Sequence, residues 1–298
     1  MRILVTGGTG FIGRNLLPTL LHAGHHVTLL LREAYGLGAP LPADLAWRRA
    51  EFDVVYADLR TYSLTARAVA EAAPDAVIHL AAAGVTDPFL SVDTALRHNV
   101  TGVLNLLRAC LEKGAAQRLV IGRTPGELSA MNVYAASKAA AWQFCRMYAH
   151  TQAWPIVGAM IFQAYGPGQP AHTLIPAALR AALAGEDFPM TAGTQQRDWV
   201  FVEDVAEGLL RMVSAELPPG LTLDLGTGRL TEVAAVAQQL YSLAGRGGRP
   251  LPGALPGRPG EDSAQCADAD RTAAWLDWRA AIDLPTGLRR LLRHGTVQ

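Results

Sequence analysis

The chain has 298 residues, half of them apolar, which is enough to bury a large core in one large domain or two joined units. Its 26 basic and 26 acidic residues give a formal net charge of zero, which argues against a nucleic-acid-binding surface. The three cysteines form no Cys-x-x-Cys pair, so neither a zinc site nor a disulfide framework is indicated.

The N-terminus runs directly from Met1 and Arg2 into a short apolar segment, without the pattern of a signal peptide. No uncharged apolar stretch reaches the ~20 residues that a membrane-spanning helix needs. We therefore expect a cytoplasmic protein that binds neither membrane nor nucleic acid and carries no metal.

Short apolar runs alternate with longer helical patterns through the first 160 residues or so. The runs predict strands at 2–6, 27–31, 54–57, 76–79, 118–121 and 156–161. The helical patterns lie at 12–23, between the strand at 54–57 and Val69, at 92–111 and at 133–150. Apolar runs of this length are typical of strands buried on both faces, and their alternation with helices predicts an α/β fold with a doubly wound parallel sheet.

The first predicted strand leads into a glycine-rich turn with Gly7, Gly10 and Gly13. Gly7 suits the tight turn, Gly10 the approach of a pyrophosphate, and Gly13 the close packing of helix on strand. Phe11 and Ile12 begin the helix, whose unpaired N–H groups and dipole would face the phosphates. The pattern predicts a Rossmann-type site for a nicotinamide dinucleotide.

The residue after the second strand decides between the two nicotinamide cofactors. Arg32 stands there and suits the 2′-phosphate of NADP, with Arg14 as a possible helper. Glu33 follows and would instead hydrogen-bond the ribose of NAD. We predict NADP as the preferred cofactor, with NAD as the alternative.

Tyr134 and Lys138 lie four residues apart at the start of a predicted helix, and therefore on one face of it. Only two of the 26 basic residues are lysine, so a lysine at this position is informative. We predict that Tyr134 is an acid/base catalyst whose pKa is lowered by the Lys138 ammonium and by an oxidised nicotinamide.

Together these patterns resemble the extended short-chain dehydrogenase/reductase family, in its nucleotide-sugar epimerase/dehydratase/reductase branch, over essentially the whole chain. Further matching segments are Asp58-Leu59, His79-Leu80-Ala81-Ala82, Asn99, Tyr165-Gly166-Pro167-Gly168, 197–205 and 258–261.

The resemblance implies roles for these segments. Asp58 and Leu59 would lie beside the adenine, and Asn99 would support the catalytic residues. Leu80, Ala81 and Ala82 would run alongside the bound cofactor. By the same resemblance Lys138 would hold the nicotinamide ribose.

The resemblance also implies a substrate site. Thr124 would hydrogen-bond the reacting substrate oxygen, with Ser129 as the alternative. Arg197 and Arg258 would bind the substrate diphosphate, and Gln163 is a further candidate substrate contact.

Several positions depart from the family pattern. Only nine residues separate Thr124 from Tyr134, where the family loop is usually longer. Thr124-Pro125-Gly126-Glu127 replaces the Thr-Asp-Glu of the dehydratases, which argues against dehydration. Met160 and Gln163 replace an arginine and an asparagine.

Beyond residue 165 turn residues become denser, and 245–260 is expected to be a loop. We therefore expect a cofactor-binding domain at 1–165, joined by parts of 196–228, and a smaller mixed substrate-binding lobe at 166–298. Open α/β sheets bind ligands beyond the carboxyl ends of their strands, so the expected substrate site is a cleft between the lobes.

The predicted function is oxidoreduction of a nucleotide-activated sugar, foremost 4-keto reduction. The alternatives are a 4-epimerase with retained NAD, a cofactor-binding regulator without catalysis, and a reductase of a small carbonyl compound. A homodimer is also predicted, because the helices at 92–111 and 133–150 carry more apolar residues than one face against a sheet requires.

Overall fold

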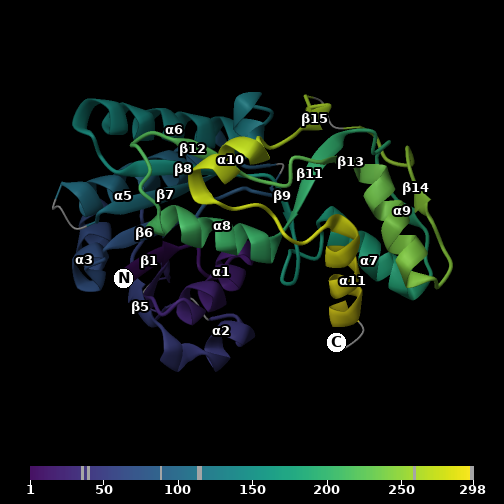
Figure 1. Cartoon of the computed structure of the whole chain (residues 1–298), viewed down its shortest axis with the longest axis horizontal. Coiled ribbons are helices and arrows are strands. Elements are labelled where there is room, and N and C mark those ends of the chain that lie inside the picture. The colour runs from purple at the N-terminus through teal and green to yellow at the C-terminus, as the bar shows by residue number, and fades with distance from the viewer. Residues whose placement is uncertain (35–36, 39–40, 88, 113–115, 258–259, 296–298) are drawn as a thin grey trace. The chain divides into compact units, whose positions relative to one another are not determined.

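The computed structural model describes residues 1–34, 37–38, 41–87, 89–112, 116–257 and 260–295 (Figure 1). The chain divides into two compact units. The first consists of residues 1–160 and 206–223, and the second of residues 161–205 and 224–298. Among the described residues, no helix combines the length and the apolar character needed to cross a membrane.

A seven-stranded sheet forms the centre of the first unit, in the order β12-β8-β7-β6-β1-β2-β5. Its strands are β1 (Arg2–Thr6), β2 (His26–Leu31), β5 (Asp53–Tyr56), β6 (Ala76–His79), β7 (Arg118–Arg123), β8 (Ile156–Ile161) and β12 (Thr222–Leu225). Every pairing from β8 to β5 is parallel. From β1 the chain first builds one side of the sheet and then, from β6 onward, the other. The predicted doubly wound parallel sheet is confirmed.

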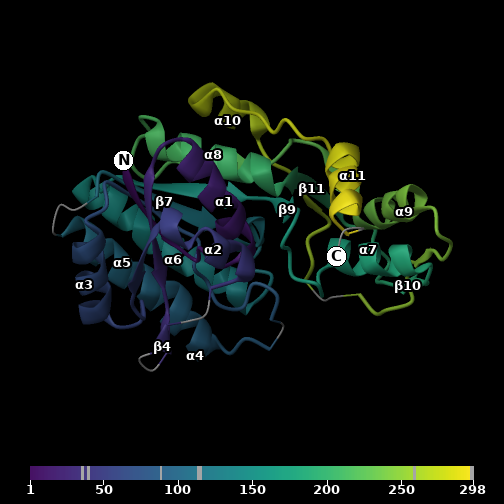
Figure 2. The same ribbon diagram turned by 90° about the horizontal axis from the view of Figure 1, so that it is seen from below.

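Helices cover both faces of this sheet. They are α1 (Phe11–His22), α2 (Ala43–Trp47), α3 (Tyr62–Ala72), α4 (Val92–Ala95), α5 (Gly102–Leu111), α6 (Val133–Gln152) and α8 (Val202–Ser214). Side chains of α3, α5 and α6 share one apolar core with β1, β2, β6 and β7. The helices α1 and α8 lie side by side on the other face (Figures 1 and 2).

The helix predicted at 92–111 is present as one helical segment with an irregular centre. Residues Leu96–Thr101 form a π-helical turn between α4 and α5. Such turns insert one extra residue into the helical repeat and are frequent at functional sites. A short hairpin of β3 (Glu33–Ala34) and β4 (Leu37–Gly38) follows β2.

The second unit is smaller and mixed. Its elements are β9 (Gln163–Tyr165), α7 (Leu174–Ala184), β10 (Phe188–Pro189), β11 (Gln196–Phe201), β13 (Leu230–Glu232), α9 (Val233–Ala244), β14 (Pro250–Leu251), β15 (Ala264–Gln265), α10 (Ala269–Leu276) and α11 (Leu284–Gly295). Strand β11 pairs antiparallel with β13 and parallel with β15 and β9. Buried aromatic residues of β9 and β11 pack on α7, α9 and α11. In the described part of 245–260, the expected loop contains the two-residue strand β14.

The buried side chain of Asp198 organises a hydrogen-bond network in the second unit. Its fully buried carboxylate accepts hydrogen bonds from the backbone N–H groups of Thr227, Gly228 and Ala267, at 2.7, 2.8 and 3.1 Å. The hydroxyl of Thr227 donates a fourth, at 2.6 Å. One side chain on β11 thus fixes the turn after β12 and the segment before α10.

We predict that Asp198→Ala lowers the free energy of unfolding by about 3 kcal/mol or more, because three buried N–H groups lose their acceptor at about 1–3 kcal/mol each. Urea unfolding followed by far-UV circular dichroism measures the loss. Asp270→Ala is the control, since Asp270 forms an exposed ion pair with Arg279 that is worth at most about 1 kcal/mol. An unchanged midpoint for Asp198→Ala would show that the four bonds do not stabilise this unit.

Candidate active site

At two positions the glycine turn after β1 leaves no room for a Cβ atom. Gly7 has a φ of +73°, and a Cβ there would lie 2.6 Å from the backbone nitrogen of Ala81. A Cβ on Gly13 would lie 2.4 Å from the carbonyl oxygen of Gly7, so α1 packs directly on the turn. At Gly10 the nearest atom would be 3.2 Å away.

Gly10 is the N-cap of α1 and provides no side-chain cap for the first-turn N–H groups that begin at Phe11 and Ile12. A helix start of this kind suits a bound diphosphate, because both the N–H groups and the helix dipole favour an anion. The residues present therefore fit a dinucleotide. Arg14, which was expected to assist Arg32 in binding a 2′-phosphate, instead forms an ion pair with Asp44 at 2.8 Å.

The end of β6 is joined to this turn by a buried pair. The hydroxyl of Thr6 lies 2.7 Å from Nδ1 of His79 and accepts from the N–H of Ala81 at 3.3 Å. Burial, together with a smaller effect of the Lys138 charge, lowers the pKa of His79 to about 3, so the imidazole is neutral at physiological pH. Leu80, Ala81 and Ala82 continue from this pair as a half-buried segment against Gly7.

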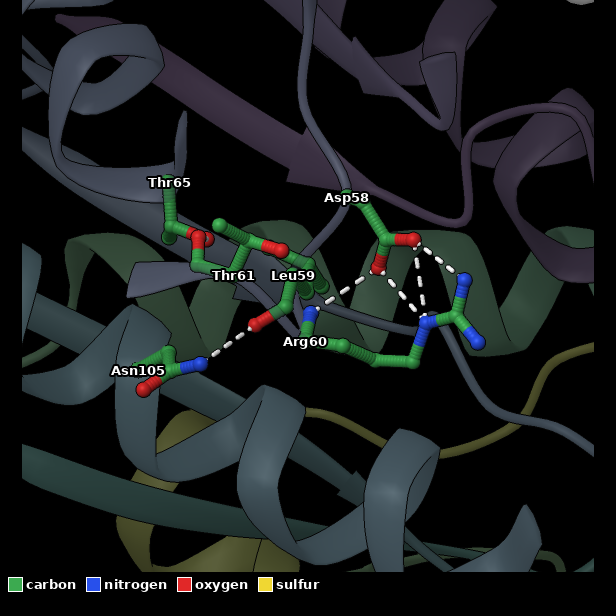
Figure 3. Close-up of polar contacts among 6 residues, drawn as sticks. All are labelled: Asp58, Leu59, Arg60, Thr61, Thr65 and Asn105. Carbon is green, nitrogen blue, oxygen red and sulfur yellow. Dashed lines mark hydrogen bonds and ion pairs between the residues drawn. The ribbon is translucent and has the colours of Figure 1, made fainter. Parts of the chain in front are cut away.

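The loop after β5 places a charged pair near the end of β2 (Figure 3). Asp58 accepts from the backbone N–H and from Nε of Arg60, both at 2.9 Å, and this contact lowers the pKa of its carboxyl group. Asn105 on α5 donates to the carbonyl of Leu59 at 2.8 Å and fixes the loop.

His98 also interacts with the charged pair of this loop. Burial lowers the pKa of His98, and the charges of Arg60 and Arg32 add to that effect while Asp58 opposes it. Arg32 itself is exposed just after β2. The side chain of Glu33 lies outside the described residues.

Asn99, in the π-helical turn, connects two parts of the site. Its buried amide accepts from the N–H of Ala83 at 2.8 Å and donates to the carbonyl of Ala83 at 3.0 Å. The same amide nitrogen donates to the hydroxyl of Ser137 at 2.9 Å, and that hydroxyl donates to the carbonyl of Tyr134 at 2.7 Å. Asn99 therefore positions the first turn of α6 relative to the loop after β6.

Tyr134 lies in that first turn and Lys138 in the next, and Asn132 caps the helix by accepting from the N–H of Ala135 at 2.8 Å. Lys138 is buried, and burial lowers the pKa of its ammonium while the Glu127 carboxylate opposes the change. For Tyr134 the expectation of a lowered pKa is wrong in the chain by itself. Burial raises the pKa of its phenol, and the negative charge of Glu127 raises it further. The phenol is therefore protonated at neutral pH.

Thr124 directly follows β7 and begins the 3₁₀ turn Pro125–Leu128. Its hydroxyl accepts from the backbone N–H of Glu127, and Oε1 of Glu127 accepts from the N–H of Thr124 at 3.0 Å. Ser129, the alternative hydroxyl, is exposed, and it donates to the carbonyl of Gly126 at 3.4 Å. Thr124 thus lies half-buried at the end of β7, whereas Ser129 lies exposed at the far end of the turn.

The candidate substrate residues belong to the second unit. Arg197 is buried and donates to the carbonyls of Gln196 and Asp262 at 2.8 and 2.9 Å and to Glu261 at 3.0 Å. Gln163 is exposed on β9. Arg258 lies outside the described residues.

With this geometry in view, the comparison with known proteins identifies the family. Residues 3–226 match the model of the NAD dependent epimerase/dehydratase family. The chain belongs to this family. It is thus an enzyme of the extended short-chain dehydrogenase/reductase type, and the predicted family is confirmed.

Curated family members are similar over nearly the whole chain. A dTDP-glucose 4,6-dehydratase of Xanthomonas campestris pv. campestris is 30% identical, over 96% of this chain and 90% of its own length. A UDP-glucose 4-epimerase of Neisseria meningitidis is 26% identical, over 95% and 94%. Among solved structures, Thermus thermophilus UDP-glucose 4-epimerase in complex with NAD has a TM-score of 0.83 at 27% identity, and the match covers 99% of this chain and 98% of that one.

Two features of this epimerase/dehydratase site could not be identified from sequence. Ser137 lies between Tyr134 and Lys138, but its link to Asn99 depends on a contact 38 residues away along the chain. The Arg123–Glu127 ion pair is buried, and four-residue spacing was its only sequence signal.

We predict an acid-sensitive contribution from His79. Its pKa is about 3 in the folded chain and about 6.5 when unfolded, so the unfolded chain binds a proton that the folded chain excludes. The stabilisation is complete above about pH 6.5 and is lost toward pH 3, at up to about 1.4 kcal/mol per pH unit.

Urea unfolding at several pH values, compared between wild type and His79→Gln, measures this contribution. The variant should lose less stability between about pH 6.5 and pH 4. Replacing the exposed His172 in the same way controls for the loss of a histidine. Equal slopes for wild type and His79→Gln would contradict the assignment.

Proposed function

We propose that this enzyme moves a hydride between a nicotinamide cofactor and a carbon of a nucleotide-activated sugar, foremost in 4-keto reduction. The observation that carries the proposal is the chain of hydrogen bonds from Asn99 through Ser137 to Tyr134. This chain of bonds ends at the backbone carbonyl of Tyr134 and so restrains the start of α6, which carries a protonated phenol and, four residues later, a buried ammonium. Thr124 directly follows strand β7. A regulator without catalysis would not need this arrangement.

In the reduction, Tyr134 acts as the acid. A reduced nicotinamide dinucleotide, held at the glycine turn of Gly7, Gly10 and Gly13, would supply the hydride for the ketone carbon. The phenol of Tyr134 transfers its proton to the ketone oxygen, which becomes a hydroxyl, and Thr124 hydrogen-bonds the same oxygen. Lys138 provides the positive charge that stabilises the phenolate left behind. The raised pKa of Tyr134 suits this direction, because the phenol begins protonated.

The surroundings of Glu127 argue against dehydration, although a dehydratase is among the similar proteins. Removal of a proton from a sugar carbon needs a carboxylate that reaches the substrate. Oε1 of Glu127 accepts from Thr124, Oε2 accepts from Arg123, and the side chain is 1% exposed. Both oxygens are thus committed to the protein. Epimerisation at C4 with retained NAD uses the same three catalytic groups and is the second candidate, supported by the similar epimerases.

For the cofactor, we propose NADP within a family that is NAD-dependent. Arg32 follows β2, where the ribose of a dinucleotide on such a sheet would lie. Arg60 adds positive charge to the same loop region. The carboxylate of Asp58 is already paired with Arg60, which limits its repulsion of a 2′-phosphate.

For the substrate, Arg197, Gln163 and Arg258 are proposed contacts of the nucleoside diphosphate. The bonds of Arg197 to Glu261 and to two carbonyls hold its guanidinium in a fixed position. A cation that is already oriented loses less side-chain entropy when it binds a phosphate.

We also propose a homodimer that uses α6. Of the apolar residues expected on the two dimer helices, Val100, Val103, Leu106, Leu107, Trp142 and Cys145 are buried within the first unit. Phe144 and Met147, by contrast, are 43% and 40% exposed on α6. An apolar stripe on a long helix suits a two-fold contact.

Tyr134→Phe tests the reaction. It should lower turnover roughly 10²- to 10⁴-fold, because a positioned acid is lost, and leave cofactor binding unchanged. The assay follows nicotinamide absorbance and product formation with UDP-glucose, dTDP-glucose and their 4-keto forms. Tyr148→Phe is the matched control, since Tyr148 lies on the same helix and stacks on Trp154. Full activity of Tyr134→Phe would refute the mechanism.

Arg32→Ala tests the cofactor. Calorimetry should show NADPH binding more tightly than NADH to the wild type, and the variant should lose roughly 10- to 150-fold in NADPH affinity, with little change for NADH. Arg48→Ala, which removes an exposed arginine paired with Glu51, is the control. Tighter binding of NADH by the wild type would instead favour NAD and the epimerase candidate.

Light scattering tests the dimer. The wild type should show about twice the 31.7 kDa chain mass, and Phe144→Glu should shift it toward the monomer because a charge would be buried in the contact. Leu243→Glu on α9 is the control, at a residue that is 39% exposed. A wild type with the mass of one chain would rule out the dimer.

A further inference from the structure

A buried ion pair lies directly beside the catalytic residues. Arg123, the last residue of β7, contacts Oε2 of Glu127 through both Nε and a terminal nitrogen, each at 2.8 Å. Their side chains are 10% and 1% exposed. The guanidinium also lies 4.5 Å from the centre of the Trp142 ring and donates to the hydroxyl of Thr222 at 2.9 Å.

The neighbouring strand provides the space that this arginine needs. A Cβ on Gly158 of β8 would lie 2.8 Å from Cδ of Arg123, 2.8 Å from the Thr222 hydroxyl and 2.9 Å from the Trp142 ring. Two strands, a helix and a 3₁₀ turn therefore accommodate one guanidinium. Buried ion pairs contribute little net stability compared with apolar residues, so stability alone is a weak explanation for this one.

The remaining contacts of Glu127 lead to Thr124. Its second carboxylate oxygen accepts from the N–H of Thr124 at 3.0 Å. Its own backbone N–H donates to the Thr124 carbonyl at 3.0 Å and, in a capping box, also to the Thr124 hydroxyl oxygen. A hydroxyl oxygen that accepts from an N–H group keeps its own hydrogen for another acceptor. The contacts with Glu127 therefore prepare Thr124 to donate toward a substrate oxygen.

We propose that Glu127, held by Arg123, is a positioning residue that fixes the Thr124 hydroxyl as a hydrogen-bond donor and sets the charge environment of Tyr134 and Lys138. The inference rests on the proposed function, since it assigns Thr124 and Tyr134 to the substrate oxygen. This role also explains the short connection between Thr124 and Tyr134. A 3₁₀ turn of four residues, held by the buried carboxylate of Glu127, is enough to position Thr124.

The titratable groups around the catalytic pair come from four elements. Glu127 from the 3₁₀ turn raises the pKa of both Tyr134 and Lys138. Arg123 from β7 lowers that of Lys138. The Cys145 thiol from α6 and the neutral His79 from β6 also face Lys138. Within this set Glu127 is the carboxylate that favours the protonated phenol and the protonated amine.

Glu127→Gln tests the proposal in steady-state kinetics. We expect kcat to fall roughly 10- to 100-fold with cofactor affinity unchanged, because the neutral amide no longer pairs with Arg123 and the turn that places Thr124 loses its anchor. The alkaline limb of the kcat profile should also move to lower pH, because loss of the negative charge lowers the pKa of Tyr134. Glu207→Gln is the matched control: Glu207 pairs with Arg211 at the same four-residue spacing, on α8, and this variant should behave as the wild type.

A second variant guards against misfolding, since Glu127→Gln leaves a buried arginine unpaired. Arg123→Met combined with Glu127→Gln removes both charges and should show the same loss of kcat and the same shift in pH profile. Wild-type kcat and an unshifted profile in either folded variant would overturn the proposal.

Tyr134→Phe, assayed in parallel, separates this inference from the proposed function. If Tyr134→Phe is inactive while Glu127→Gln is fully active, the positioning role alone is wrong. If Tyr134→Phe is also fully active, the proposed mechanism is wrong and the positioning role is overturned with it.

Discussion

The amide of Asn99 satisfies three hydrogen bonds at a buried position, and together they restrain two parts of the active site. Two hold the backbone of Ala83 after β6, and the third holds Ser137 in the first turn of α6. An unpaired buried amide would be costly, so the loop and the helix can move relative to each other only by breaking these bonds. The π-helical turn provides the irregular backbone in which Asn99 lies.

The cofactor side of the site depends on close backbone approach instead of on side chains. Gly7 and Gly13 bring the turn after β1 against the segment after β6 and against the start of α1. The pair of Thr6 and His79 adds a polar contact between the same two strand ends. Strands β1 and β6 are the neighbours between which the direction of chain progression changes. Their ends are thus held together both by glycines that allow close backbone contact and by one buried polar pair.

The sequence was sufficient for features that depend on local pattern. Apolar runs located six strands of the sheet, and glycine spacing located the close-packed turn after β1. The four-residue spacing of Tyr134 and Lys138 placed both residues near the start of one helix, and both lie in α6; their catalytic role belongs to the proposed function. The direction of the pKa shift of Tyr134 could not be predicted, because it follows from burial and from the folded position of Glu127.

The interactions of Arg197 were also beyond prediction from sequence. The residue was expected to contact a diphosphate, and in the structure its guanidinium is anchored to Glu261 and to two backbone carbonyls. Those partners come from β11 itself and from a segment more than sixty residues later, which periodicity cannot bring together.

The discontinuity of the first unit has a consequence for the order of its biosynthesis. Its edge strand β12 pairs beside β8, yet 60 residues separate the end of β8 from the start of β12 along the chain. A ribosome therefore releases six strands of the sheet, and part of the second unit, before the seventh exists. Until then β8 presents an unpaired edge, which is a site for wrong pairing between nascent chains. The partly synthesised chain, with its unpaired β8 edge, must therefore avoid aggregation until residue 225 has left the ribosome.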